Sequence, residues 1–541
     1  MNPRSALSTY PRATLLAAFV LLAVVHTWPL ARYPTSRSRL DSADGALNAW
    51  IVSWVAHTLP RHPTQLFNAP IFHPSPLTLA YSEPLIVQGV IAMPVRALGG
   101  SPALAFNVVL LAGLALTGWA VSLFAWRTTG SLPAAVLAGS AAAFNAHTLM
   151  RLPHLQALHL EFLPLALLAL DRLTSSGRAR DGALIGLALA LQALASIYAL
   201  VFTGWAVVMA TLASVQSVAN RRRFWIGMLA AAAVAGILLA PLLYPYYVVS
   251  HQAGLTRNVH EAERFSSTWR DYLFTGARFH YGLWSSAFSS SADANFPGIL
   301  ASLLAALGLV TGWRDSRHVR IAAAVTCGSV LLSVLPRLPG FAWAHEHIAV
   351  LSAIRGYSRA GQMALVGVAL LAAHGLAHLQ RRCRTPRAWW TVATCAIVLV
   401  NLEALRAPID FAPFAGIPRI YEELDDQHAG AVLELPIHGP GAEFHNAPYM
   451  VNGTDYWRPL VNGYSGFLPP DYAAICATLH QFPDAASLAW LRSAHVTTVV
   501  LHRAEFARLK GESQLTRIDA SPDLAEAGLS GDIELLTVKG R

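Results

Sequence analysis

The acidic residues after the first apolar segment are the strongest candidates for chemistry. Asp41 and Asp44 lie in Asp41-Ser-Ala-Asp44-Gly45, which follows the apolar run at residues 13–30. A carboxylate just outside a membrane can act as a general base on a hydroxyl acceptor, or hold Mg²⁺ or Mn²⁺ against a phosphate. Asp44 is the stronger candidate for a catalytic or metal-binding role, and Asp41 is a candidate for substrate binding. The alternative is that Asp44 only caps the helix that begins there.

A second acidic candidate, Glu83, directly precedes Pro84 and Leu85 at the start of another apolar segment. A carboxylate at the headgroup level of a membrane is costly unless it is used. Glu83 is therefore a candidate for substrate binding, and helix capping is the alternative.

Basic side chains form two further groups. The first group contains Asn145, His147, Arg151, His154, Gln156 and His159. Arginine and imidazole can bind phosphate oxygens or a cation, so Arg151, His154 and His159 are candidates for substrate binding. Interfacial histidines are often merely solvated, and no zinc spacing such as H-E-x-x-H occurs.

The second basic group is the pair Arg355 and Arg359, four residues apart at the start of a later apolar segment. Two arginines at the headgroup level could clamp a lipid phosphate through paired hydrogen bonds. The alternative is that both side chains only extend toward lipid headgroups.

The aromatic and amide residues of segment 449–467 are the last candidate group. Tyr and Trp faces can pack on sugar rings while Asn and Asp bind hydroxyls. An ordinary domain core with satisfied amides is equally consistent with this segment.

The elements that must position these residues belong to a membrane protein. The chain has 541 residues, of which 54% are hydrophobic and 13% are charged, whereas soluble domains are about 25% charged. Because a bilayer-crossing helix needs roughly 20 apolar residues, about eleven spans are expected. They are residues 13–30, 103–125, 131–149, 156–170, 182–196, 198–216, 224–248, 295–313, 319–335, 359–380 and 387–406.

The distribution of arginine sets the expected topology. With the N-terminus inside, the inner loops contain most of the basic residues, including the cluster Arg221-Arg222-Arg223. Basic clusters at both ends of residues 182–216 require two passes, broken near Ser196. The segment 84–98 must not cross, and is expected to be a re-entrant or surface helix. The helix after Asp44 has apolar residues on one side and is expected to lie on the membrane interface.

The tail after the last span has a different character. Residues 407–541 contain 17 acidic and 9 basic residues, although the whole chain has a net charge of +9. Strands are expected at 431–436, 495–502 and 533–538, and helices at 473–479 and 485–491. The expected fold is an all-α transmembrane bundle, residues 1–406 with a large outer loop at 31–102, followed by a soluble α/β domain at 407–541. The arginines are distributed among the loops and do not cluster along one face, which argues against nucleic-acid binding.

The order of these features resembles the polytopic membrane glycosyltransferases of the GT-C fold, which use polyprenyl-phosphate sugars. The matching features are the acidic residue Asp44 in the first outer loop, a surface helix, and the signature Glu83-Pro84-Leu85. The resemblance covers about residues 13–406. It implies that Asp44 serves as catalytic base or metal ligand and that Glu83 contacts the donor phosphate site. The chain lacks the lysine and second proline often found at that signature, which shifts the phosphate contact to Arg355 or Arg359.

The expected function is therefore an inverting transfer of a hexose or pentose from a polyprenyl-phosphate donor. The acceptor would be a glycan, lipid or protein outside the cytoplasm. The expected location is the plasma (inner) membrane of a bacterium, with a cytoplasmic N-terminus and an extracytoplasmic tail. One alternative is a transporter or flippase for a lipid-linked glycan, although the sequence shows neither the internal repeats nor the mid-span charges of such proteins. The other is a non-catalytic envelope assembly protein whose outer domain binds a glycan.

Overall fold

The protein divides into two compact units, each defined by the contacts among its own residues. The computed structural model describes residues 9–253, 258–289, 293–424 and 430–539. The helical unit comprises Met1–Tyr33, Val108–Leu243 and Thr256–Asp410, and the mixed unit comprises Pro34–Asn107, Tyr244–Leu255 and Phe411–Arg541. Each unit contains a buried apolar cluster of its own.

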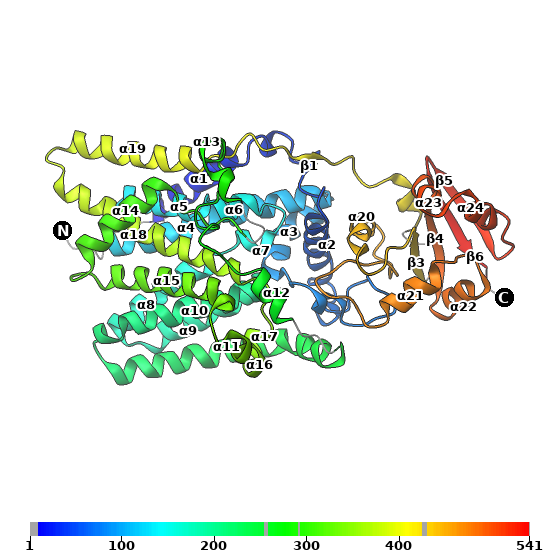
Figure 1. The fold of residues 1–541 in the computed structure, drawn as a ribbon, viewed down its shortest axis with the longest axis horizontal. Coiled ribbons are helices and arrows are strands. Elements are labelled where there is room, and N and C mark those ends of the chain that lie inside the picture. Colours follow the sequence, from blue (N-terminus) through cyan, green and yellow to red (C-terminus); the bar gives the residue numbers. More distant parts are fainter. Residues whose placement is uncertain (1–8, 254–257, 290–292, 425–429, 540–541) are drawn as a thin grey trace. The chain divides into compact units, whose positions relative to one another are not determined.

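Long apolar helices form the helical unit, and α8, α9, α10 and α15 run side by side within it (Figure 1). The longer helices are α1 (Thr9–His26), α4 (Pro102–Thr129), α5 (Leu132–Ala143), α8 (Phe162–Ser176), α9 (Ala179–Ala195), α10 (Ile197–Ser214), α11 (Arg221–Ala253), α14 (Ile299–Gly312), α15 (Arg317–Val334), α18 (Gly361–Arg382) and α19 (Pro386–Ala404). The start of α4 (residues 102–107) and the end of α11 (residues 244–253) belong to the mixed unit. The short ones are α6 (Ala146–Met150), α7 (Leu155–Leu158), α12 (Val259–Arg264), α13 (Arg278–Leu283), α16 (Phe341–His347) and α17 (Ala349–Ser352).

The lengths and compositions of these helices are those of a multi-pass membrane protein. Among the described residues, five helical segments are long and apolar enough to cross a bilayer. They are Pro102–Thr129, Ile197–Ser217, Arg221–Gln252, Arg317–Arg337 and Tyr357–Arg382. The other predicted spans also coincide with helices, several of them shorter. The count of about eleven crossings stays a prediction.

Two polar residues interrupt the apolar segments. The predicted break near Ser196 is confirmed, because α9 ends at Ala195 and the Ser196 hydroxyl caps α10 by accepting from the Ala199 N–H at 3.1 Å. The prediction of one continuous span over residues 131–149 is wrong. Asn145 separates α5 from α6, and its side-chain oxygen accepts from the Thr148 N–H at 3.0 Å. Both residues satisfy donors that the start of a helix leaves open.

Small residues let α14 and α18 approach closely. A Cβ atom on Gly308 would lie 2.2 Å from the Leu371 carbonyl oxygen, and one on Gly375 would lie 2.0 Å from the Leu304 carbonyl oxygen. Membrane helices commonly associate through such small-residue contacts, because lipid offers no hydrophobic driving force between them.

The mixed unit combines a four-stranded sheet with helices. The sheet order is β3 (Ala431–Leu435), β4 (Val496–His502), β6 (Ile533–Val538) and β5 (Leu524–Ser530). β3 and β4 are parallel and the other neighbours are antiparallel. The helices of this unit are α2 (Ala43–Thr58), α3 (Ile86–Ala97), α20 (Ala447–Asn452), α21 (Tyr472–Leu479), α22 (Ala485–Ser493), α23 (Arg503–Lys510) and α24 (Glu512–Asp519). Short strands β1 (Arg37–Ser38) and β2 (Ala412–Pro413) pair antiparallel.

The first outer loop therefore shares a unit with the tail. Nearly all of the predicted loop 31–102 lies in the mixed unit, together with residues 411–541. Within this unit α2 contacts both α3 and α20, so segments about 400 residues apart in the sequence pack on one another.

The prediction that the helix after Asp44 lies on the membrane interface is wrong. In α2 the residues from Gly45 to Ala56 are all buried. The helix is apolar on nearly every side, and α3 and α20 cover it. Gly89 of α3 approaches so closely that a Cβ there would lie 2.3 Å from a Val55 side-chain carbon. The expected surface helix is thus a core helix of the mixed unit.

Candidate functional site

Asp44 lies in the first turn of α2 but does not cap it. The cap is Ser42, whose hydroxyl oxygen accepts from the Gly45 N–H at 3.1 Å. Gly45 is required there, because a Cβ would lie 1.8 Å from the Arg39 carbonyl oxygen. The alternative in which Asp44 only caps the helix is therefore wrong. Ser42 is the cap, and the Asp44 carboxylate is half-exposed.

The partner of Asp44 comes from the aromatic segment of the tail. The Tyr464 hydroxyl donates to Asp44 Oδ1 at 2.9 Å. The partial positive charge at the helix N-terminus favours a carboxylate in this turn. Asp44 is thus a half-exposed carboxylate held in place by a phenol, an arrangement suited to taking a proton from a bound hydroxyl.

The other two acidic candidates lie in the same unit. Asp41 pairs with Arg39 at 3.2 Å and is exposed. Glu83 is half-exposed, and the preceding Ser82 accepts through its carbonyl from the Tyr246 hydroxyl at 2.8 Å. Their substrate-binding roles stay predictions.

A metal ion at Asp44 would need ligands besides this one carboxylate. In the part of the chain that the structure describes, no cluster of three or more His, Cys, Asp or Glu side chains is placed to hold a metal ion. A cation on Asp44 would take its remaining ligands from substrate phosphate and water. Metal binding there stays a prediction.

A second candidate site is a small polar pocket in the helical unit. Its volume is about 20 Å³, enough for a water molecule. Arg151, His154 and Arg359 line it together with Tyr198 and other residues of α10 and α18. The Arg359 guanidinium lies over the Tyr198 ring, 5.1 Å from its centroid. Three of the five basic candidates thus converge on one pocket.

Asp293 positions Arg151 at this pocket. Arg151 donates through Nε and Nη2 to the two carboxylate oxygens of Asp293, at 3.1 and 2.9 Å. His147 Nδ1 lies 2.9 Å from Asp293 Oδ1, and the Ser358 hydroxyl donates to Oδ2 at 3.2 Å. Burial by itself raises the pKa of Asp293, but the charges and hydrogen bonds of His147 and Arg151 hold it well below its usual range.

Asp271 supports Asp293 in turn. The Asp293 N–H donates to Asp271 Oδ1 at 2.9 Å, and the Thr268 hydroxyl donates to Oδ2 at 2.8 Å. Both aspartates are buried. Neither aspartate is among the predicted site residues, because both lie far along the chain from Arg151 and no spacing connects them.

The remaining basic candidates, His159 and Arg355, make contacts elsewhere. His159 is fully buried, with Nδ1 2.9 Å from Glu161 Oε1, and Gln192 donates to its carbonyl at 3.1 Å. Arg355 pairs with Glu261 at 3.3 Å and lies over the Phe265 ring. Neither lines the small pocket, and their predicted roles are untested.

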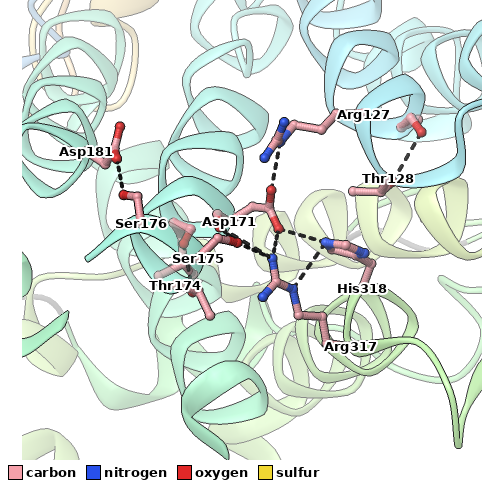
Figure 2. Close-up of polar contacts among 11 residues, drawn as sticks. Arg127, Thr128, Asp171, Thr174, Ser175, Ser176, Asp181, Arg317 and His318 are labelled. Carbon is pink, nitrogen blue, oxygen red and sulfur yellow. Dashed lines mark hydrogen bonds and ion pairs between the residues drawn. The ribbon is translucent and has the colours of Figure 1, made fainter. Parts of the chain in front are cut away.

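A third cluster, around Asp171, joins three helices of the helical unit (Figure 2). Arg127 Nε and His318 Nε2 each lie 2.7 Å from an Asp171 carboxylate oxygen, and Arg317 contacts the same carboxylate. These residues come from α4, α8 and α15. Arg127 and Arg317 therefore neutralise a buried acid and tie helix ends together.

Comparison with known proteins supports the fold. No family model and no curated protein matches the sequence. The arabinofuranosyltransferase AftD from mycobacteria superposes with a TM-score of 0.64 at 15% identity, covering 99% of this chain and 40% of AftD. ArnT from Cupriavidus metallidurans, solved with undecaprenyl phosphate, superposes with a TM-score of 0.52 at 12% identity, covering 98% of both chains.

This chain thus spans about two fifths of the length of AftD and nearly the whole of ArnT. Both are GT-C membrane glycosyltransferases. At these identities the likeness concerns the arrangement of the backbone, and it confirms the resemblance drawn from the order of sequence features. The chain has the GT-C fold.

Proposed function

We propose that this protein is a membrane glycosyltransferase that moves a sugar from a polyprenyl-phosphate donor to a hydroxyl acceptor. The observation that carries the proposal is the Asp44 carboxylate, held by Tyr464 in the first turn of a buried helix of a GT-C scaffold. The undecaprenyl phosphate bound to ArnT supports a lipid phosphate as the donor group. The arabinofuranosyl activity named for AftD makes a pentose a reasonable donor sugar beside a hexose.

In the proposed reaction Asp44 removes the proton from the acceptor hydroxyl as its oxygen attacks the anomeric carbon. A new carbon–oxygen bond forms to the acceptor, and the bond between the anomeric carbon and the phosphate oxygen breaks. The electron pair leaves with the lipid phosphate, and attack opposite to the leaving group inverts the anomeric centre. Preorganised charges that meet the developing negative charge lower the barrier of such a step.

The guanidinium groups of Arg151 and Arg359 are the proposed phosphate anchor; the pocket that they line has room only for a water molecule, so the phosphate would lie at its opening. Two guanidinium groups can form short, charge-assisted hydrogen bonds to phosphate oxygens. His154 lines the same pocket and adds a further nitrogen donor or acceptor. Asp41 and Glu83, which lie in the same unit as Asp44, are proposed to contact the substrate.

The proposed topology follows the arginine pattern of the loops. About eleven crossings put the N-terminus in the cytoplasm and the soluble α/β tail outside the plasma membrane of a bacterium. The acceptor is then a glycan, lipid or protein on the outer side. A divalent cation bridging Asp44 and the donor phosphate is a variant of this proposal, and a chelator tests it. Activity that EDTA abolishes and Mg²⁺ or Mn²⁺ restores would support the bridge.

The decisive experiment compares Asp44→Asn with Asp41→Asn in purified full-length protein. Transfer from polyprenyl-phosphoryl pentose and hexose donors to an envelope extract is measured by radiolabel. Removing a general base typically costs 10²–10⁴-fold in rate. We expect that loss for Asp44→Asn and a much smaller loss for the exposed Asp41→Asn.

Normal transfer by a folded Asp44→Asn protein would refute the mechanism. If no variant and no wild-type preparation turns over either donor, the transporter and assembly-protein alternatives become the better explanations.

A further inference from the structure

A groove in the mixed unit shares no lining residue with either candidate site. Its volume is about 570 Å³, within the usual range for small-molecule sites. Its walls come from the C-terminal ends of α2 and α3 and from Trp457, in the segment after α20. Its chemical character comes from two rings, His57 and Trp457, and two guanidinium groups, Arg61 and Arg96.

Trp457 departs from the rest of its segment. Most of the aromatic segment 449–467 is an ordinary core, in which Tyr449, Tyr456 and Asn462 are buried. Asn462 is satisfied there, because its amide pairs with the backbone of Glu434 at 2.8 and 2.9 Å. Trp457 is half-exposed at the groove instead.

The backbone of Trp457 is strained. Its φ angle is +50°, a region that bulky side chains rarely occupy. Such strain persists only where the surroundings enforce it, and it concentrates at functional sites. Here the Trp457 ring stacks on His57 with centroids 4.8 Å apart and lies 5.4 Å from the Trp54 ring. The strain therefore holds an indole ring in the groove wall.

The two arginines give the groove a positive charge. Arg96 donates to the carbonyl oxygens of Gly100 and Thr454, at 2.7 and 3.2 Å. The exposed Arg61 donates to the His57 carbonyl at 2.7 Å. These carbonyl partners orient the guanidinium groups without neutralising them, and Asp455 interacts with Arg96 from outside the groove lining.

We propose that this groove binds an acidic saccharide. The apolar face of a sugar ring packs on Trp457, as CH groups do on indole rings, and a carboxylate or phosphate on the sugar binds Arg61 and Arg96. A neutral glycan would leave the positive charge of Arg61 unused. An acyl chain would have to desolvate Arg61, which is costly.

The first test measures binding to the purified full-length protein in detergent by titration calorimetry, with no donor present. The probes are a uronic-acid oligosaccharide and a neutral oligosaccharide of the same length and linkage. We expect at least tenfold tighter binding of the acidic probe, weakening as salt is raised. Equal affinities, or binding of neither probe, would overturn the proposal.

The second test uses matched substitutions. Trp457→Ala should weaken binding about tenfold, whereas Trp457→Phe keeps an aromatic face and should retain most of it. Arg61→Gln should weaken binding about tenfold, whereas Arg419→Gln, at an exposed arginine outside the groove lining, should leave it unchanged. If Trp457→Ala does not fold, the exposed Arg61 still decides the question.

A lipid headgroup is the competing occupant. Phosphatidylglycerol is therefore added to the same micelles. Arg61-dependent binding of that lipid, without binding of the acidic oligosaccharide, would overturn the saccharide assignment. Because no sugar transfer is measured, these outcomes are independent of the Asp44 mechanism.

Discussion

At the scale of single residues, buried carboxylates decide which positive charges face the small pocket. Asp293 accepts from both Nε and Nη2 of Arg151 and lies against His147. It thereby fixes the orientation of a guanidinium whose position the sequence left open. The capping of α2 was decided in a similar way. Ser42 and Asp44 are both good capping residues, and only the folded geometry selects Ser42.

Replacing Asp293 should be more damaging than replacing its neighbour Asp271. Asp293→Asn leaves buried positive charge uncompensated, which costs about 3–5 kcal/mol. Both oxygens of Asp271 accept from neutral donors of Thr268 and Asp293, so Asp271→Asn turns an amide NH2 group toward a donor and should cost about 1–3 kcal/mol. Apparent thermal midpoints of the two full-length variants in detergent test this order. Equal midpoints would show that Asp293 does not compensate that charge.

A buried acid–base pair in the tail should make stability depend on pH. Glu434 accepts from the Tyr421 hydroxyl at 2.8 Å, and His502 Nε2 lies 2.6 Å from the same carboxylate oxygen. Burial raises the pKa of Glu434. Burial by itself lowers the pKa of His502, but the hydrogen bond and charge of Glu434 raise it overall.

Both groups then bind protons more tightly in the folded state than in the unfolded one. Stability from each is fully present below its unfolded pKa, near 4.5 for Glu434 and 6.5 for His502, and is lost as pH rises through the folded pKa. Thermal midpoints measured from pH 5 to 9 should therefore fall more steeply in the wild type than in a Glu434→Gln, His502→Gln double variant. Parallel curves would contradict this coupling.

At the scale of elements, hydrophobic runs and polar breaks predicted much of the fold. The break at Ser196 and the strands β3, β4 and β6 lie within a residue or so of their expected positions. The burial of α2 could not be predicted in the same way, because α20 is distant in the sequence. An apolar helix has the same sequence pattern whether a membrane surface or another part of the protein covers it.

The contact between α14 and α18 gives a prediction at this scale. Gly375→Val would place side-chain atoms against the Leu304 backbone, and overpacking of this kind typically costs about 1–3 kcal/mol. Gly236→Val of α11 is the matched control, because a Cβ there meets open space. We expect loss of yield and a lower thermal midpoint for Gly375→Val only. Similar behaviour of both variants would argue against close packing at Gly375.

At the scale of the whole molecule, charge and fold match lead to the same class of protein. The backbone matches ArnT along almost its entire length, while the arginine-rich loops predict an orientation. Which segments pack together within each unit follows from contacts between residues far apart in sequence, and hydropathy carries no such information.

Site-specific labelling tests the orientation. In a background without Cys327, Cys383, Cys395 and Cys476, a cysteine replaces either Arg222 or Arg419, which are both exposed. A membrane-impermeant maleimide should label Arg419→Cys in intact cells, and Arg222→Cys only after permeabilisation. The reverse pattern would invert the proposed topology.

The contact of Asp293 with Arg151 has one more consequence. Because the pair is formed within the protein, the small pocket carries its own counter-anion when nothing else is bound. In the proposed reaction, a departing lipid phosphate would be replaced at that guanidinium by Asp293 and not by an ion from the medium. Free inorganic phosphate would then gain little by binding there, and the lipid chain would supply the rest of the donor's affinity.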